Sequence, residues 1–297
     1  MVSAAIDKYI YIGINRTFTD DYFLKYSALE RVKQVEEIDH SIIRSALTVH
    51  DIGPSLEIVS LADIPAGTGL GSSGSFTVGL LRALHAFKRH HVTAGDLAEE
   101  AAHIEMNMLR RAAGKQDHYI AAFGGITCFE FGQDGTVHVS PLSISTETLH
   151  DLEENLLMFF TGYSREADSL LDEQRTRSEA GDEEMLANLE GVERLGRQIR
   201  EALEAGDTHG FASLMDEHWL RKRERSSSMS NDAINRWYDA GMANGALGGK
   251  LIGAGGGGFL LFYAEDQKAL RDAMAQEGLT EVRFGFDFDG STVTARD

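Results

Sequence analysis

Apolar residues recur along this chain with two spacings, which predict a mixture of strands and helices. Runs of β-branched and aromatic residues predict strands at 9–14, 56–60, 125–131, 137–139, 156–160, 259–263 and 282–288. Apolar residues three or four positions apart predict helices over 76–87, 93–108, 185–203, 207–219, 233–242 and 268–275. No internal repeat interrupts this order, and the Ser/Thr-rich stretch 143–148 suggests a domain boundary between residues 145 and 155.

The amino-acid composition of the chain argues against some classes of binding partner. The 297 residues are 42% hydrophobic, enough for two modest domains or one large one. The net charge of -19 argues against binding to nucleic acid or to an anionic membrane surface. No apolar run approaches the roughly 20 residues of a membrane helix, and the first residues lack the pattern of a signal peptide. The single cysteine, Cys128, lies in a predicted strand and is expected to be a buried structural thiol, so we expect a cytoplasmic protein.

A glycine-rich turn carries the strongest chemical signal. Residues 65–75 read Pro-Ala-Gly-Thr-Gly-Leu-Gly-Ser-Ser-Gly-Ser and lead into a predicted helix. Glycines let the backbone approach a ligand closely, and free N–H groups at a helix start attract anions. The turn is therefore suited to phosphate, although a flexible strand–helix connection would read similarly. It is neither a Walker A loop nor a nucleophile elbow, since it has no Gly-Lys-Ser/Thr and lacks the final glycine of Gly-x-Ser-x-Gly.

A second glycine-rich segment lies far downstream. Residues 250–259 read Lys-Leu-Ile-Gly-Ala-Gly-Gly-Gly-Gly-Phe, and eight glycines fall between Gly245 and Gly258. Together the two segments resemble the second and third signatures of the GHMP kinases, which include galactokinase, homoserine kinase, mevalonate kinase and phosphomevalonate kinase. The resemblance implies an α+β fold with an N-terminal domain of mixed sheet and helices and a ferredoxin-like C-terminal domain. It also implies domains at 1–150 and 151–297, with the active site in the cleft between them.

Within the family, the chain is most similar to kinases of D-glycero-D-manno-heptose 7-phosphate. The matching pieces cover nearly the whole chain and lie at residues 5–11, 114–117, 161–165, 246–250 and 286–291. The resemblance implies phosphorylation of the anomeric hydroxyl with ATP. A kinase for an unphosphorylated sugar such as fucose and a non-catalytic ligand-binding relative are the alternatives.

The resemblance also implies roles for individual residues. The ATP-binding residues would be Pro65, Gly67, Gly69, Leu70, Gly71, Ser72, Ser73, Gly255 and Gly256. Glu105 borders an apolar helical stripe and, with Ser73, would bind Mg²⁺. Asp117 would face the acceptor hydroxyl as base or orienting acceptor, and Lys115 would offset phosphate charge. Taken alone, each would be an ordinary turn or surface residue.

A further phosphate on the substrate would need cations of its own. Candidates are Arg165, Arg223 and the backbone at Gly253, with His218 and Arg221 also available. Each charge alone is typical of a solvated surface, and the 11 histidines show no spacing typical of metal ligands.

One family feature is not found in the given sequence. Family members begin with a strand and a glycine-rich loop that contacts the sugar, whereas this sequence starts after them at Met1. We expect the chain as given to lack that strand and the first motif. The sequence does not predict an oligomeric state.

Overall fold

The computed structural model describes residues 1–162, 176, 181–225 and 229–295, and contacts divide the chain into two compact units. The first unit comprises Met1–Ala4, Ala66–Leu70 and Ile126–Phe286. The second comprises Ala5–Pro65, Gly71–Gly125 and Asp287–Asp297. The units are discontinuous in sequence, and the glycine-rich turn contributes to both. The expected domains 1–150 and 151–297 stay a prediction.

The first unit contains two antiparallel sheets. Its elements are β1 (Val2–Ala4), β6 (Ile126–Phe131), β7 (Val137–Pro141), α5 (Thr146–Asn155), β8 (Leu156–Phe160), α7 (Glu183–Ala205), α8 (Thr208–Glu224), α9 (Asp232–Ala243), β9 (Ala246–Leu251), β10 (Phe259–Ala264), α10 (Gln267–Gln276) and β11 (Thr280–Glu281). One sheet has the order β1-β6-β7 and the other the order β11-β8-β10-β9.

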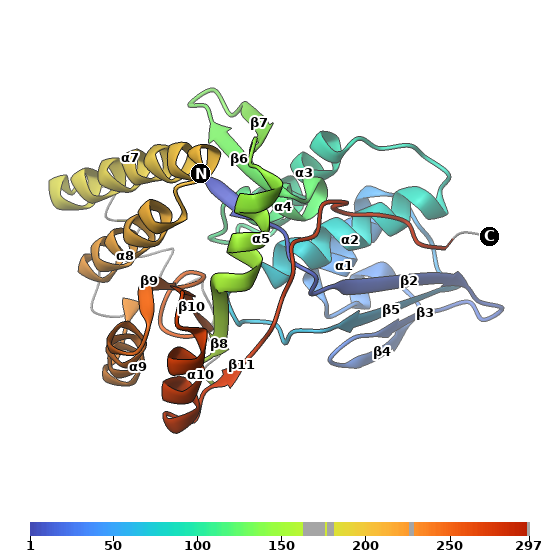
Figure 1. The fold of residues 1–297 in the computed structure, drawn as a ribbon. Coiled ribbons are helices and arrows are strands. Elements are labelled where there is room, and N and C mark those ends of the chain that lie inside the picture. The colour runs from blue at the N-terminus through green and yellow to red at the C-terminus, as the bar shows by residue number, and fades with distance from the viewer. Residues whose placement is uncertain (163–175, 177–180, 226–228, 296–297) are drawn as a thin grey trace. The chain divides into compact units, whose positions relative to one another are not determined.

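The four-stranded sheet of this unit has ferredoxin-like topology. Its four strands follow one another along the chain as β8, β9, β10 and β11, and helices follow β8 and β10. Within the sheet the first strand therefore lies between the fourth and the third, as in ferredoxin-like folds. Helices α8 and α9 pack on β9, and α7 lies along α8 (Figure 1). The core between helices and sheet contains Trp219, Leu260 and Phe262, each fully buried. The expected ferredoxin-like fold is confirmed in this unit.

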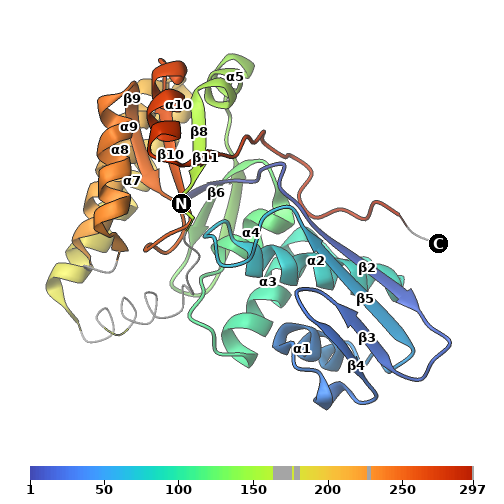
Figure 2. The same ribbon diagram turned by 90° about the horizontal axis from the view of Figure 1, so that it is seen from below.

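The second unit is built on a mixed sheet. Its elements are β2 (Ile10–Arg16), β3 (Tyr22–Lys25), β4 (Leu29–Val32), η1 (Val35–Glu37), α1 (Ser41–Val49), β5 (Leu56–Ala62), α2 (Ser72–Phe87), α3 (Ala94–Ala102), η2 (His103–Met108) and α4 (Gln116–Phe123). The strand order is β2-β5-β3-β4, and β3 runs parallel to β5 while the other pairs are antiparallel. Helix α2 packs against β2 and also against α3 and α4 (Figure 2). The expected α+β class is confirmed.

The structure confirms the predicted burial of Cys128 and contradicts one predicted strand. Cys128 is free and buried, as predicted. The predicted strand at 282–288 is wrong, because only Thr280 and Glu281 pair with β8 and the chain then leaves the sheet. Aromatic residues at 284, 286 and 288 imitate strand alternation, but Phe284 and Phe286 contact each other instead.

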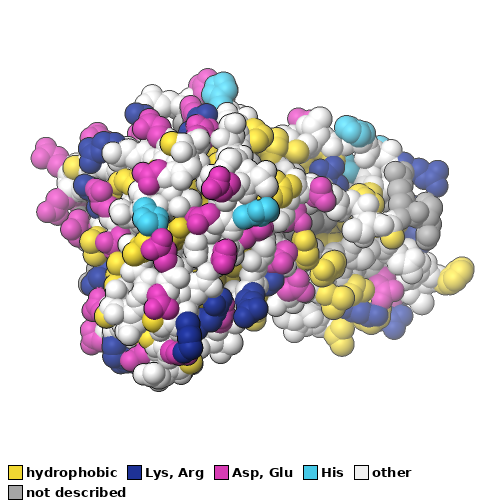
Figure 3. Space-filling view, viewed as in Figure 1, with side chains coloured by type: hydrophobic (Ala, Val, Ile, Leu, Met, Phe, Trp, Pro, Cys, Tyr) yellow, Lys and Arg dark blue, Asp and Glu magenta, His cyan; other side chains and the backbone are white. Residues whose placement is uncertain are grey.

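The surface reflects the acidic composition. Figure 3 shows Asp and Glu side chains spread over the visible face, with Lys and Arg interspersed. No helix among the described residues is both long enough and apolar enough to span a bilayer.

Candidate active site

The start of helix α2 is shaped by glycines in the second unit. Gly71 caps the helix in the left-handed region, with φ of 69°, and no side chain caps this end among the described residues. A β-carbon on Gly71 would lie 3.1 Å from Asp117 Cγ, and one on Gly74 would lie 2.9 Å from Asp117 Cβ. The glycines therefore let Asp117, in the first turn of α4, lie directly against the helix start.

Glu105 is the centre of a buried hydrogen-bond network beside this helix start. Its side chain lies in η2, which continues α3, and the residue is only 1% exposed. Ser73 Oγ donates to Glu105 Oε2 at 2.5 Å, and Thr77 Oγ1 donates to Oε1 at 2.6 Å. His118 Nε2 lies 3.1 Å from Oε1. The structure thus brings together the predicted pair Ser73 and Glu105.

A cation already contacts the two predicted metal ligands. Arg111 Nη1 lies 3.1 Å from Ser73 Oγ and 3.4 Å from Glu105 Oε2. Burial opposes ionisation of Glu105, but hydrogen bonds from His118, Ser73 and Thr77 lower its pKa to about 2. An ionised carboxylate beside a hydroxyl offers the hard oxygen atoms that Mg²⁺ prefers. The residues present therefore fit Mg²⁺, provided that the guanidinium moves aside.

The environment of Asp117 raises the pKa of its carboxyl group. Burial, together with the nearby Glu105 carboxylate, raises the pKa of Asp117 above its ordinary value, although His118 partly offsets this. A higher pKa makes a carboxylate a better base near neutral pH. Lys115, in contrast, binds both oxygens of Glu99, at 2.7 and 2.9 Å. Its predicted role beside a phosphate stays a prediction.

In the first unit, the other predicted glycines pack against each other. A β-carbon on Gly69 would lie 3.1 Å from Gly253 Cα, and one on Gly258 would collide with the Thr68 carbonyl. Gly253 has φ of 83°, and Gly256 N–H donates to the Met229 carbonyl at 2.9 Å. The two glycine-rich segments, distant in sequence, therefore meet backbone to backbone in this unit.

The cations predicted for a second phosphate have different surroundings. Arg165 lies outside the described residues. The Arg223 guanidinium lies 6.0 Å from the centre of the Trp219 ring, and Arg221 is paired with Glu217. Burial, followed by the neighbouring Lys250, lowers the pKa of His218 to about 2, which keeps its imidazole neutral.

Sequence reasoning assigned no role to three residues of the Glu105 network. Thr77 stands four residues after Ser73, and this spacing places both hydroxyls on one face of α2. His118 directly follows Asp117 and is 1% exposed. The Thr77 spacing was a usable signal, whereas nothing in the sequence distinguishes His118 or Arg111.

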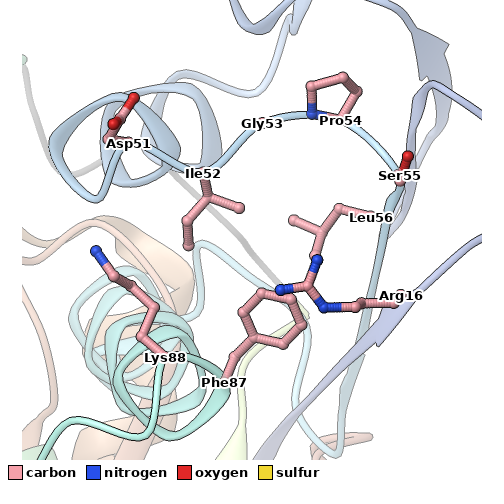
Figure 4. A pocket seen from close by; sticks show the side chains of 9 residues that line it. All are labelled: Arg16, Asp51, Ile52, Gly53, Pro54, Ser55, Leu56, Phe87 and Lys88. Atoms are coloured by element: carbon pink, nitrogen blue, oxygen red, sulfur yellow. The ribbon is translucent and has the colours of Figure 1, made fainter.

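A hollow in the second unit lies away from these residues in sequence. It measures about 370 Å³ and is lined by residues 51–56 with Arg16, Phe87 and Lys88 (Figure 4). The Arg16 guanidinium stacks 4.7 Å from the Phe87 ring centre, and Lys88 Nζ donates to the His50 carbonyl at 2.8 Å. Both cations thus contact neighbouring groups of the protein. None of the predicted site residues lines this hollow.

Known proteins resemble both halves of the chain. The sequence matches the family descriptions "GHMP kinases N terminal domain" over residues 34–125 and "GHMP kinases C terminal" over residues 199–279. D-glycero-alpha-D-manno-heptose 7-phosphate kinase of Campylobacter jejuni subsp. jejuni serotype O:2 is 32% identical over 72% of this chain and 62% of that protein. The bifunctional fucokinase/GDP-fucose pyrophosphorylase of Arabidopsis thaliana is 27% identical over 82% of this chain and 24% of that protein. The matched chain thus spans less than two thirds of these curated relatives.

A solved structure resembles the fold. The D-glycero-D-manno-heptose 1-phosphate kinase from Bacteroides thetaiotaomicron has a TM-score of 0.78 and 24% identity, covering 98% of this chain and 88% of that one. The two family matches together take in more than half of the chain, and the ferredoxin-like and mixed sheets agree with them. The fold and the glycine segments define a small-molecule kinase scaffold. The chain belongs to the GHMP kinase family.

Proposed function

We propose that this protein transfers the terminal phosphoryl group of ATP to the anomeric hydroxyl of a sugar phosphate, D-glycero-D-manno-heptose 7-phosphate. The 32% identity to a heptose 7-phosphate kinase supports this substrate class. The observation that carries the proposal is the burial of Asp117 against Gly71 and Gly74 at the uncapped start of α2. This arrangement puts a proton acceptor next to a natural anion site.

In the proposed reaction, Asp117 accepts a proton and the backbone at the start of α2 positions the phosphates. Asp117 accepts the proton of the sugar hydroxyl while that oxygen forms its bond to the phosphorus atom, and the bond between the phosphorus and ADP breaks. Backbone N–H groups from Gly71 to Ser73 orient the phosphates. Phosphoryl transfer depends mainly on such positioning and on charge neutralisation, which is why few side chains are needed.

Magnesium would be held by Glu105 and Ser73. Bound there with ATP, it would neutralise charge on the transferred phosphoryl group. Thr77 and His118 have a supporting role, because they hold the Glu105 carboxylate ionised and in one orientation. Arg111 keeps a positive charge near the same oxygens when no metal is bound.

A kinase for unphosphorylated fucose is the second candidate. The 27% identity to a bifunctional fucokinase over 82% of this chain supports this candidate. The two functions differ in whether the acceptor already carries a phosphate.

A panel of acceptors tests the proposal. The purified chain would be incubated with ATP and Mg²⁺ and with heptose 7-phosphate, unphosphorylated heptose, fucose or galactose, while ADP release is followed. We expect the highest kcat/KM with heptose 7-phosphate, and acceptor-dependent ADP release at least about a hundredfold slower from Asp117→Asn. A higher kcat/KM with fucose would assign the second function instead, and no acceptor-dependent release with any sugar would reject both.

A further inference from the structure

Helix α8 and strand β9 bring several basic side chains together in the first unit, where Lys222 is buried and the others are half-buried. The helix and the strand are in close contact, because a β-carbon on Gly248 would collide with the Ala212 carbonyl. His218 and Lys222 stand one turn apart on α8, and Lys250 lies on the facing strand. Arg225 follows at the C-cap of the helix. This basic cluster is therefore assembled from residues that are far apart in sequence.

In the part of the chain that the structure describes, no carboxylate pairs with Lys222 or Lys250. Lys222 is only 6% exposed, and its ammonium group donates to the Gly253 carbonyl. Within the described ranges, neither lysine lies at ion-pair distance from a carboxylate, unlike Lys25, which pairs with Glu57. Arg225 Nε donates to the Asn188 side-chain oxygen at 2.7 Å. Lysines are rarely buried in proteins unless they are paired, so Lys222 is exceptional, whereas Lys250 is half-buried.

This arrangement lowers the pKa of both lysines. Burial, followed by repulsion from Lys250 and Arg225, lowers the pKa of Lys222 to about 7. Burial and Arg225 lower the pKa of Lys250 to about 8. The folded protein alone therefore penalises both charged ammonium groups, and a bound anion would offset that penalty.

The charge of the cluster indicates which anion it suits. A phosphate monoester carries two negative charges near neutral pH and three oxygen atoms that accept hydrogen bonds. The phosphates of ATP bring Mg²⁺ as their own counterion, whereas a phosphate ester on a sugar brings none. Two ammonium groups and a guanidinium thus match an uncompensated monoester.

We propose that Lys222 and Lys250, assisted by Arg225, bind the phosphate monoester that the acceptor sugar carries before transfer. The residues predicted for this purpose were Arg165, Arg223 and the backbone at Gly253, with His218 and Arg221 also available, and of these His218 belongs to the basic cluster. The inference rests on the proposed function, since it takes the acceptor to be a sugar phosphate. It makes the cluster the determinant that separates sugar phosphates from plain sugars.

Binding calorimetry without ATP tests the cluster independently of turnover. At pH 8 a monoester is already dianionic, so any proton uptake on binding comes from the protein. We expect the parent protein to take up about one proton per heptose 7-phosphate, because Lys222 and Lys250 regain their charge. Two buffers of different ionisation enthalpy measure this uptake. Binding without proton uptake would overturn the proposal in the unmodified protein.

Substitutions then identify the residues. Lys250→Met should weaken heptose 7-phosphate binding roughly ten- to hundredfold, the loss expected for one charge-assisted contact, and should reduce the proton uptake. Lys222→Met should do the same, and Lys222→Arg should retain binding if the loss is one of charge rather than of packing. Lys268→Met removes a lysine whose side chain is 85% exposed and should leave binding unchanged. Circular dichroism establishes that each variant is folded.

The outcomes separate this inference from the proposed function. Unchanged affinity in a folded Lys250→Met protein would overturn the cluster while leaving sugar-phosphate kinase activity intact. Weaker binding of ATP rather than of the sugar phosphate would also overturn it, because the cluster would then serve the nucleotide. If the parent binds heptose 7-phosphate with proton uptake but never phosphorylates it, the cluster stands and the proposed function fails.

Discussion

Replacing Glu105 by glutamine should destabilise the second unit in a way that depends on pH. The carboxylate accepts hydrogen bonds from Ser73 and Thr77, lies 3.1 Å from His118 Nε2, and has its pKa lowered from 4.5 to about 2. A group whose folded pKa is depressed stabilises the fold above its unfolded pKa, and that contribution disappears as the pH falls towards the folded value. A neutral amide cannot supply it at any pH.

The size of the effect follows from the shift. A pKa lowered from 4.5 to about 2 corresponds to about 3 kcal/mol at pH 7, and linkage leaves about 1 kcal/mol of this at pH 3. The parent should therefore exceed Glu105→Gln in free energy of unfolding by about 3 kcal/mol at pH 7. The difference should shrink by about 2 kcal/mol between pH 7 and pH 3.

Urea unfolding followed by far-ultraviolet circular dichroism measures both values. Glu36→Gln, which changes an exposed carboxylate of the same unit, is the matched control and should shift the unfolding free energy by less than about 0.5 kcal/mol. A difference between parent and Glu105→Gln that stays constant from pH 7 to pH 3 would refute the reasoning, because the carboxylate would then not be held ionised by its neighbours.

Three further substitutions test the site. Asp117→Asn should lower kcat 10²–10⁴-fold while ATP affinity measured by calorimetry changes little, and a rate within threefold of the parent would remove Asp117 from the mechanism. Ser73→Ala should raise the Mg²⁺ concentration for half-maximal activity, and a titration that overlays the parent would show that the hydroxyl is not a ligand. Arg111→Gln should lower the same Mg²⁺ concentration, because the guanidinium contacts both proposed ligand oxygens. An unchanged or higher value would show that Arg111 does not compete with the metal.

Elements with strong periodicity were predictable from the sequence. The apolar stripe of 185–203 became α7, and the apolar runs at 156–160 and 259–263 became the neighbouring strands β8 and β10. The hairpin of β3 and β4 was not predicted, because each strand has only four residues and is too short to show a period.

The parts of the candidate site that lie in the glycine motifs, or that match the family, could be predicted from the sequence. The pairing of Ser73 with Glu105 was anticipated, although 32 residues separate them, because the family resemblance assigned both residues to the metal. The basic cluster was not, since Lys222 and Lys250 each read as a surface charge in sequence. Only the packing of α8 on β9 shows that Lys222 is buried and that, among the described residues, no carboxylate pairs with either lysine.

Identification of the reaction product tests the central claim most directly. The purified protein would be incubated with ATP, Mg²⁺ and D-glycero-D-manno-heptose 7-phosphate, and phosphorus-31 NMR would follow the phosphate signals, with Asp117→Asn as the matched control. The account predicts a new anomeric phosphate signal that grows in step with ADP while the original 7-phosphate signal is retained. ADP formation without an anomeric phosphate, or equal product from Asp117→Asn, would contradict it.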